Sequence, residues 1–387
     1  MAFGIYIHIP YCIQRCSYCD FATYEKSSIL PPSEYIEFLK KEIHVYGPLL
    51  IGMKVDTVYF GGGTPSLIEA ELLVSVLETL KKVGFRFVEG IEITMEINPA
   101  TIDEEKLKIY LEAGINRFSV GAQTFRNDLL KSVGRQHSAK DTQKTLELLS
   151  NKGLNYTFDL LFALPGQTKK DLERDLDWVK YFAPNHLSAY CLTVQDGHPL
   201  SKMRLPELEQ IEMFDVIETE LGRIAMDRYE ISNFAKAGFE SKHNLIYWTD
   251  ENYWGAGLGA HSYIKDNFWG KRFWNPNNIQ QYTTKITKLP NGVASSIISY
   301  RENEQYEELT ENQTLTDYCH IFLRIKKGLC LENLEVKFGK FRRTQVETIL
   351  KDLQIKGYVE YVLKRWRLSK DGVLVSNRIF EACTFLD

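Results

Sequence analysis

Short apolar runs rich in β-branched residues alternate, over the first half of the chain, with longer segments whose apolar residues recur at helical spacing. The apolar runs predict strands at residues 4–9, 56–60, 91–97, 116–121, 155–162 and 186–193. The amphipathic segments between them predict helices at 33–46, 67–82, 103–113, 139–151 and 168–181. Repeated strand–helix alternation is typical of a parallel sheet covered by helices.

The sheet is expected to close partly into a barrel, with a doubly wound open sheet as the competing architecture. Cysteines follow the first predicted strand and residues 61–66 follow the second, as the site residues of α/β barrels do. Glu96, Gln123 and Asp159 lie at or near the ends of the next three strands and should meet at the same rim. Buried polar residues need partners, so capping a loop or pairing with a basic core residue is the alternative role for each.

The pattern changes after about residue 200. Residues 207–226 predict another amphipathic helix, and 229–275 are rich in aromatic residues, glycine and asparagine. Helices at 310–338 and 344–356 and a β-wing at 358–368 predict a small winged-helix-like α+β domain. We therefore expect three parts: a partial (β/α)6 barrel over 1–228, a linking region over 229–300, and the winged-helix-like domain over 301–387.

Composition places the chain among ordinary globular proteins. Its 387 residues are 44% hydrophobic and 25% charged, with a formal net charge of −4. The total charge does not indicate a nucleic-acid partner. The segment 340–370 carries an excess of basic residues, which we interpret as solvated surface or as a contact for a protein or a membrane surface, with nucleic-acid binding as the alternative. Charged residues interrupt positions 1–30, so we expect no signal peptide, no spanning segment and a cytoplasmic location.

Three of the seven cysteines, Cys12, Cys16 and Cys19, form a C-x3-C-x2-C motif directly after the first strand. The other four are scattered, which fits a reducing compartment. Closely spaced thiolates hold iron–sulfur clusters or zinc. Three ligands leave one iron of a four-iron cluster open, and an open position is the mark of a working metal centre. A zinc knuckle is the alternative, although no second Cys/His pair lies nearby in the sequence to complete a tetrahedron.

These motifs resemble those of the radical S-adenosylmethionine (SAM) superfamily, through the three cysteines, Tyr18 and the Gly-Gly-Gly-Thr-Pro run at 61–65. Residues 6–12, 118–123, 134–135 and 159–168 are similar to the oxygen-independent coproporphyrinogen III oxidase branch. Two features depart from that branch. Phe21 stands where the oxidases carry a fourth cysteine, and only residues 1–5 precede Tyr6 where the oxidases have an extension.

The H-N-x-x-Y-W run within residues 241–248 is instead similar to the haem chaperone family (HemW), as are residues 229–234 and 255–261. The resemblance implies a [4Fe–4S] cluster on the three cysteines, with SAM completing the open iron. It also implies a SAM pocket formed by Tyr6, Tyr18, Gly62, Gly63, Thr64, Glu96, Gln123, Arg135 and Asp159. Glycines at 62 and 63 leave the backbone accessible, and the carboxylate of Asp159 suits ribose hydroxyls. Arg135 can bind a carboxylate of SAM or of a neighbour.

The same resemblance assigns the haem site. His243 is the expected axial ligand of the iron, next to Asn244, with Tyr247 and Trp248 against the porphyrin face. The alternative is that His243 is a hydrogen-bonded core histidine. His261 and Cys191 are weaker candidates for the iron, and no C-x-x-C-H motif for covalent haem attachment is present.

The expected function is that of a haem chaperone in porphyrin metabolism, which binds haem and a SAM-ligated cluster and transfers haem to an acceptor protein. We expect no catalytic residues and no coproporphyrinogen oxidase activity. The competing function is oxidative decarboxylation of coproporphyrinogen by radical SAM chemistry. The acceptor can be a membrane-associated respiratory protein, which would place the chain at the membrane periphery. Whether it is a monomer or a homodimer stays open.

Overall fold

The computed structural model describes residues 2–195, 197–265, 269–299 and 305–387. Six parallel strands form the centre of its main sheet, in the order β1-β4-β5-β6-β7-β8. They are β1 (Phe3–Ile9), β4 (Lys54–Gly62), β5 (Arg86–Ile97), β6 (Arg117–Gln123), β7 (Tyr156–Phe162) and β8 (His186–Cys191). All six predicted strands are confirmed, and their carboxyl ends lie at one rim.

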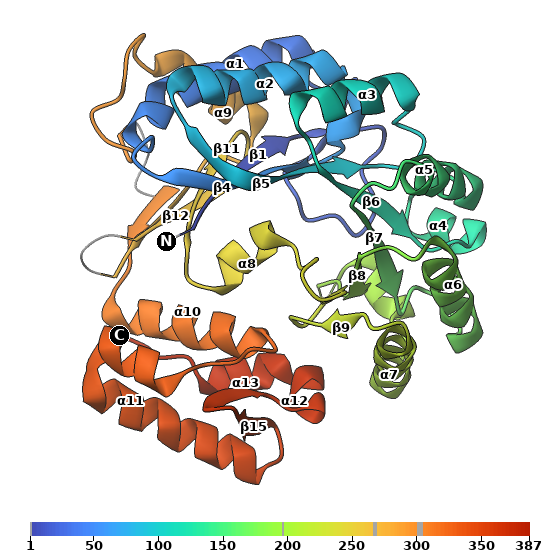
Figure 1. The fold of residues 1–387 in the computed structure, drawn as a ribbon, viewed down its shortest axis with the longest axis vertical. Helices are drawn as coiled ribbons and strands as arrows, with labels where there is room; N and C mark the ends of the chain where they lie inside the picture. The colour runs from blue at the N-terminus through green and yellow to red at the C-terminus, as the bar shows by residue number, and fades with distance from the viewer. Residues whose placement is uncertain (1, 196, 266–268, 300–304) are drawn as a thin grey trace.

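Helices cover the outer, convex face of this sheet (Figure 1). They are α1 (Pro32–Tyr46), α2 (Ala70–Val83), α3 (Glu104–Ala113), α4 (Asn127–Ser132), α5 (Ala139–Asn151), α6 (Lys169–Phe182) and α7 (Glu207–Arg223). Ser138 and Thr168 begin α5 and α6 with capping boxes, which satisfy the first free N–H groups of each helix. Apart from the short α4, these helices were predicted from the 3.6-residue periodicity.

Each edge of the sheet is extended by short strands. On one side β11 (Asn252–Ala256) pairs parallel with β1 and is followed by β12 (His261–Ile264), β13 (Lys271–Trp274) and β14 (Tyr306–Glu308). On the other, β10 (Asn233–Ala235) and β9 (Asp227–Arg228) follow β8. The strand order runs from β14 to β9 without closure, so the sheet is open and the barrel is partial.

Part of the segment expected as a linking region thus contributes strands to the same sheet. The three-part division of the chain stays a prediction, and its boundary at residues 300 and 301 lies outside the described residues. Between β10 and β11, α8 (Lys242–Trp248) lies on the inner side of the curved sheet, opposite the outer helices (Figure 1). Helix α9 (Ile279–Lys288) packs against α1.

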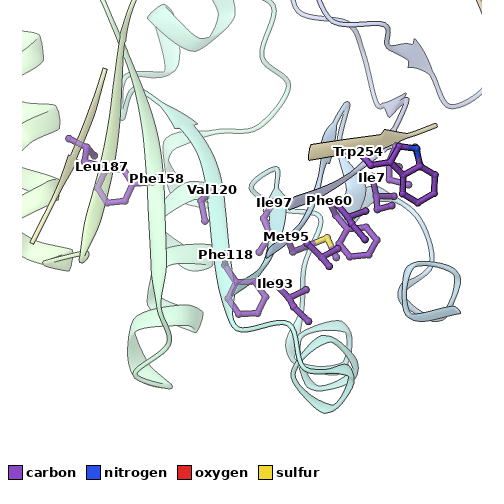
Figure 2. Close-up of a cluster of buried hydrophobic side chains, with 14 of the residues drawn as sticks. Ile7, Phe60, Ile93, Met95, Ile97, Phe118, Val120, Phe158, Leu187 and Trp254 are labelled. Atoms are coloured by element: carbon purple, nitrogen blue, oxygen red, sulfur yellow. The ribbon is translucent and has the colours of Figure 1, made fainter. Parts of the chain in front are cut away.

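The two faces of the central strands divide apolar from polar side chains. Along β5, Ile93 and Met95 point into the hydrophobic core, whereas Thr94 and Glu96 line a cavity on the inner side. Because strand side chains alternate between faces, one strand supplies both the core and the site. Figure 2 shows the apolar set from neighbouring strands, including Ile7, Phe60 and Phe118.

The C-terminal lobe contains α10 (Glu311–Arg324), α11 (Leu331–Ile355), the hairpin β15 (Val359–Val362) and β16 (Arg365–Leu368), α12 (Lys370–Leu374) and α13 (Ser376–Ala382). The wing is confirmed. The single helix predicted over 310–338 is wrong, because the chain turns between α10 and α11 at Gly328, which has a φ of 80°. A second glycine with positive φ, Gly339, kinks α11.

The remaining short elements are β2 (Tyr11–Cys12), β3 (Tyr24–Glu25) and 3-10 turns at Gly47–Leu49, Pro65–Leu67 and Pro199–Met203. In the part of the chain that the structure describes, no helix combines the length and apolar character needed to cross a bilayer.

Candidate functional site

A cavity of about 470 Å³ opens at the carboxyl ends of the central strands. It brings together residues from segments that lie far apart in the sequence. Of the predicted cluster and SAM residues, its lining includes Cys12, Cys16, Tyr18, Cys19, Gly62, Gly63, Thr64, Glu96, Gln123, Arg135 and Asp159. Tyr6 lines a neighbouring cavity instead. The expected convergence of these side chains is therefore present in the fold.

The three cysteines lie in the segment that follows β1, with Cys12 at the end of the short strand β2. The N–H of Cys19 donates to the carbonyl of Cys16 at 3.2 Å, and Arg135 Nη1 lies 3.5 Å from Cys16 Sγ. Burial, together with a smaller effect of the neighbouring Cys19 and Cys16, raises the pKa of the Cys12 thiol to about 11. A bound cation stabilises thiolates, so a metal cluster at this site would favour the ligating form of the Cys12 thiol.

The three thiols share the wall of one cavity. Among the described residues, no three Cys, His, Asp or Glu side chains are grouped closely enough to share one metal ion. A [4Fe–4S] cluster binds each thiolate through a different iron, so its ligands surround a volume instead of meeting at a point. A cavity lined by Cys12, Cys16 and Cys19 is compatible with such a ligand set.

The glycine loop after β4 fits closely against the cysteine segment. A Cβ on Gly63 would lie 2.6 Å from the carbonyl oxygen of Tyr11, and Gly62 has a φ of +113°. The N–H groups of Gly63 and Thr64 donate to the carbonyls of Ile9 and Tyr11 at 2.8 and 2.7 Å. The glycines thus permit close packing of the two loops, and these two N–H groups already have partners.

Two carboxyl groups lie inside the barrel. Glu96 accepts hydrogen bonds from the Tyr59 hydroxyl at 2.7 Å and from the N–H of Gly62 at 3.1 Å. Burial raises its pKa to about 7, and the charge of Asp159 adds to the rise. Burial raises the pKa of Asp159 to about 6 against the opposing effect of a hydrogen bond from Ser119. Both groups gain from a cationic or hydroxyl-bearing ligand.

Arg135 connects the cysteines to the strand ends. Its Nη2 donates to Asn98 Oδ1 at 2.7 Å and to the carbonyl of Gly121 at 2.6 Å. A Cβ at Gly121 would lie 2.8 Å from the guanidinium, so a larger residue there would displace the end of the Arg135 side chain. The buried Nε has no partner among the described residues, which is a sign that this arginine serves a ligand. Gln123 ends β6 with a φ of 65°, a strained conformation of the kind found at functional sites.

A second cavity, of about 1050 Å³, adjoins the first. The two share Phe21, Tyr59, Gly62, Glu96 and Asn244 in their linings. The second cavity is also lined by several aromatic side chains: Tyr6, Tyr24, His243, Tyr247, Tyr253 and His261. A large cavity therefore lies directly beside the site of the three thiols.

The structure places His243 in the interior of the protein. It is 1% exposed, and burial lowers its pKa to about 3. Its Nδ1 lies 2.7 Å from Thr57 Oγ1, and its Nε2 lies 2.8 Å from the hydroxyl of Tyr247. Tyr59 stacks on the ring at 5.0 Å. Both ring nitrogens are thus engaged, as in the alternative of a hydrogen-bonded core histidine.

The other predicted haem residues do not all lie in the same place. Asn244 and Tyr247 line the second cavity, but Trp248 lines neither cavity. Its indole instead faces the guanidinium of Arg324 on α10 at 4.3 Å. Of the weaker candidates, Cys191 lines the first cavity and His261 the second.

The sequence analysis missed three residues that shape the site. His8, Tyr59 and Asn98 contact predicted site residues. His8 and Tyr59 occupy inward positions of predicted strands. The alternation of side chains between the two faces of β1 and β4 could therefore have identified them. No comparable signal marked Asn98, which lies just past the end of β5.

Comparison with known proteins agrees with this geometry. A family model described as the radical SAM superfamily matches residues 6–179. The chain is 34% identical to the haem chaperone HemW of Bacillus subtilis (strain 168), over 97% of the chain and 98% of that relative. It is 30% identical to HemW of Escherichia coli (strain K12), over 98% and 97%. The structure of E. coli coproporphyrinogen III oxidase (HemN) has a TM-score of 0.81 at 19% identity, over 98% of this chain and 89% of that one.

Proposed function

The chain belongs to the haem chaperone (HemW) family of the radical SAM superfamily, and on that premise we propose that it binds haem and passes it to an acceptor protein. One observation carries the proposal: similarity above 30% identity extends over almost the whole chain and almost the whole of the B. subtilis chaperone. It therefore includes the segment around α8 and β12 as well as the barrel.

In this proposal Cys12, Cys16 and Cys19 hold a [4Fe–4S] cluster, and SAM occupies the rest of the first cavity. When bound, the cluster supplies an open iron for SAM. The buried carboxyl of Asp159 faces the ribose hydroxyls, and Glu96 faces the amino group of SAM, whose charge favours the ionised carboxylate. Because two N–H groups of the glycine loop already have partners, the loop would bind this amino group through its carbonyls.

Haem occupies the second cavity. Its volume of about 1050 Å³ slightly exceeds the roughly 300–1,000 Å³ found for small-molecule pockets, so the cavity has room for a large ligand. Aromatic side chains in its wall offer flat apolar contacts to a porphyrin. Phe21 is 64% exposed and lines both cavities, so it offers one such contact at the position where the oxidases carry a fourth cysteine.

A second candidate function is oxidative decarboxylation of coproporphyrinogen. The oxidase has the same fold, with a TM-score of 0.81. At 19% identity this likeness indicates a shared fold and not a shared activity. The cavity beside the cysteines would accept the substrate in that case. The greater identity to the chaperones ranks this function second.

The acceptor would receive haem at the mouth of the second cavity. We place the protein in the cytoplasm, where its seven cysteines stay reduced. A membrane-associated respiratory protein is the acceptor we favour. All the residues proposed to bind the cluster, SAM and haem belong to one chain. The proposal therefore holds for a monomer and for a homodimer.

One anaerobic experiment separates the two functions. Chain with a reconstituted cluster is loaded with haem and mixed with a haem-free cytochrome, and in parallel it is incubated with SAM, a reductant and coproporphyrinogen. We expect the cytochrome to acquire haem faster from the loaded chain than from the same concentration of free haem. We also expect no conversion of coproporphyrinogen. Sustained formation of protoporphyrinogen would instead establish the oxidase.

A further inference from the structure

We propose that His261, and not His243, is the side chain that binds haem iron in the second cavity. This inference rests on the proposed function and names the ligand within the same site. Protein ligands to haem iron are histidine, cysteine, methionine and tyrosine. Within the described lining of this cavity, only histidines and tyrosines belong to that set.

Burial disfavours the tyrosines. It raises the pKa of Tyr6, Tyr59 and Tyr247 well above the usual range and that of Tyr253 to about 12. Phenolate is the form that binds iron, so each of these side chains would be held in its non-ligating form. The hydroxyl of Tyr24 donates to the carbonyl of Asn277 at 3.3 Å.

Two of the three histidines already use both ring nitrogens. The Nδ1 of His8 lies 3.1 Å from the Tyr6 hydroxyl, and its Nε2 donates to the carbonyl of Ala22 at 2.9 Å. His243 is held in the same way by Thr57 and Tyr247. Iron binding to either ring would break a hydrogen bond inside the protein and leave a buried polar group unsatisfied.

His261 differs in both respects. Its side chain is exposed at the cavity wall, and its ring nitrogens have no hydrogen bond with any residue that the structure describes. Desolvation by the surrounding protein and the charge of Arg272 lower its pKa, which favours the neutral imidazole that binds metal. A free nitrogen lone pair is therefore available on this ring alone.

The surrounding backbone fixes the ring in place. His261 begins β12, where it pairs with Trp274 of β13, and the two rings stack at 5.5 Å and 18°. The turn before it is held by a 2.9 Å hydrogen bond from the N–H of Gly259 to the carbonyl of Pro276. At Gly255 a Cβ would lie 2.3 Å from the carbonyl oxygen of His261, so the two strands approach closely. A ligand on a rigid strand needs little reorganisation to bind.

The test is a haem titration of the full chain and of His261→Ala, His243→Ala and His44→Ala. His44 is a matched control, because it is an exposed histidine on α1 far from the cavity lining. Absorption and electron paramagnetic resonance spectra report the axial ligand, and thermal unfolding reports whether each variant folds. We expect His261→Ala to lose the histidine signature and to bind haem at least tenfold more weakly, with the same melting temperature. Added imidazole should restore the signature.

Each other result overturns the assignment. Unchanged spectra and affinity in His261→Ala, with loss of the signature in His243→Ala, would give the iron to His243. Unchanged spectra in both variants would place the iron elsewhere, while leaving the proposed function intact. If the unaltered chain takes up no haem, the proposed function itself fails together with this assignment.

Discussion

The hydroxyl of Tyr59 donates a hydrogen bond to Glu96 Oε1 at 2.7 Å, and both residues line both cavities. This pair therefore forms part of the wall between the site of the three thiols and the larger aromatic cavity. A ligand that changes the protonation of Glu96 from one side alters the hydrogen bond that Tyr59 makes on the other. The two proposed ligands thus meet the same two side chains.

The raised pKa of Glu96 makes stability depend on pH. In the folded protein the pKa is about 7, whereas an unfolded glutamate titrates near 4.3. The folded state therefore holds the proton more tightly, and the free energy of unfolding should fall as pH rises from about 4.5 to about 7. Relative to Glu96→Gln, the ligand-free chain should lose roughly 1–3 kcal/mol over this window. Urea unfolding at several pH values measures it. A difference that does not change with pH would contradict the assigned burial.

Replacing any one of Cys12, Cys16 and Cys19 by alanine should abolish the cluster. Two thiolates are too few ligands to retain a [4Fe–4S] cluster. Iron, acid-labile sulfide and the visible absorption band should therefore all be absent after anaerobic reconstitution. Cys330→Ala is the control, because Cys330 lies in the C-terminal lobe and its thiol donates to Glu332 at 3.1 Å. Full iron content in a variant at 12, 16 or 19 would remove that residue from the ligand set.

Gly63→Ala should disturb the cysteine loop without touching a cysteine. Its Cβ would lie 2.6 Å from the carbonyl oxygen of Tyr11, next to Cys12, so the two loops must separate. Overpacking of this kind costs about 1–3 kcal/mol, and we expect a lower melting temperature with reduced cluster content. Gly52→Ala is a matched control, since nothing lies within 4 Å of a Cβ there. Equal behaviour of the two variants would contradict the close approach.

Arg324→Ala should loosen the C-terminal lobe. Arg324 Nε donates to Glu230, which is 0% exposed, at 2.6 Å, and its guanidinium also lies on the Trp248 ring. Removing the arginine leaves the buried carboxylate without its charged partner, although Ser232 and Asn233 still donate to it, and such a loss costs about 3–5 kcal/mol. The exposed pair Lys326–Asp227 is the control, because Lys326→Ala should cost less than about 1 kcal/mol. Limited proteolysis and urea unfolding measure both. Equal losses would show that the buried pair does not hold the lobe.

The central fold could be predicted because its signals are local. The 2.0-residue and 3.6-residue periods identify six strands and their covering helices, and the capping residues locate several helix ends. The short strands β9 and β12–β14 have too few residues to show a period. Their place is set by pairing with distant strands, as in the register of His261 with Trp274.

The site divides in the same way. The three cysteines and Gly62 to Thr64 stand out through spacing along the chain, so they could be identified from the sequence. The surroundings of His243 could not, because its partner Thr57 lies 186 residues away. The same holds for Arg135 and Asn98, which meet only after β5 and β6 pair. Long-range hydrogen bonds decide whether a histidine is free to bind a ligand or is held in the core. The periodicity of the sequence does not predict these bonds.

An equilibrium titration of haem into the anaerobically reconstituted chain tests the central claim most directly. The account predicts saturable uptake of about one haem per chain, in a protein whose iron–sulfur cluster stays intact throughout the titration. Non-saturable uptake, or binding that releases the cluster iron, would contradict the account, because the two cavities would then not hold their ligands side by side.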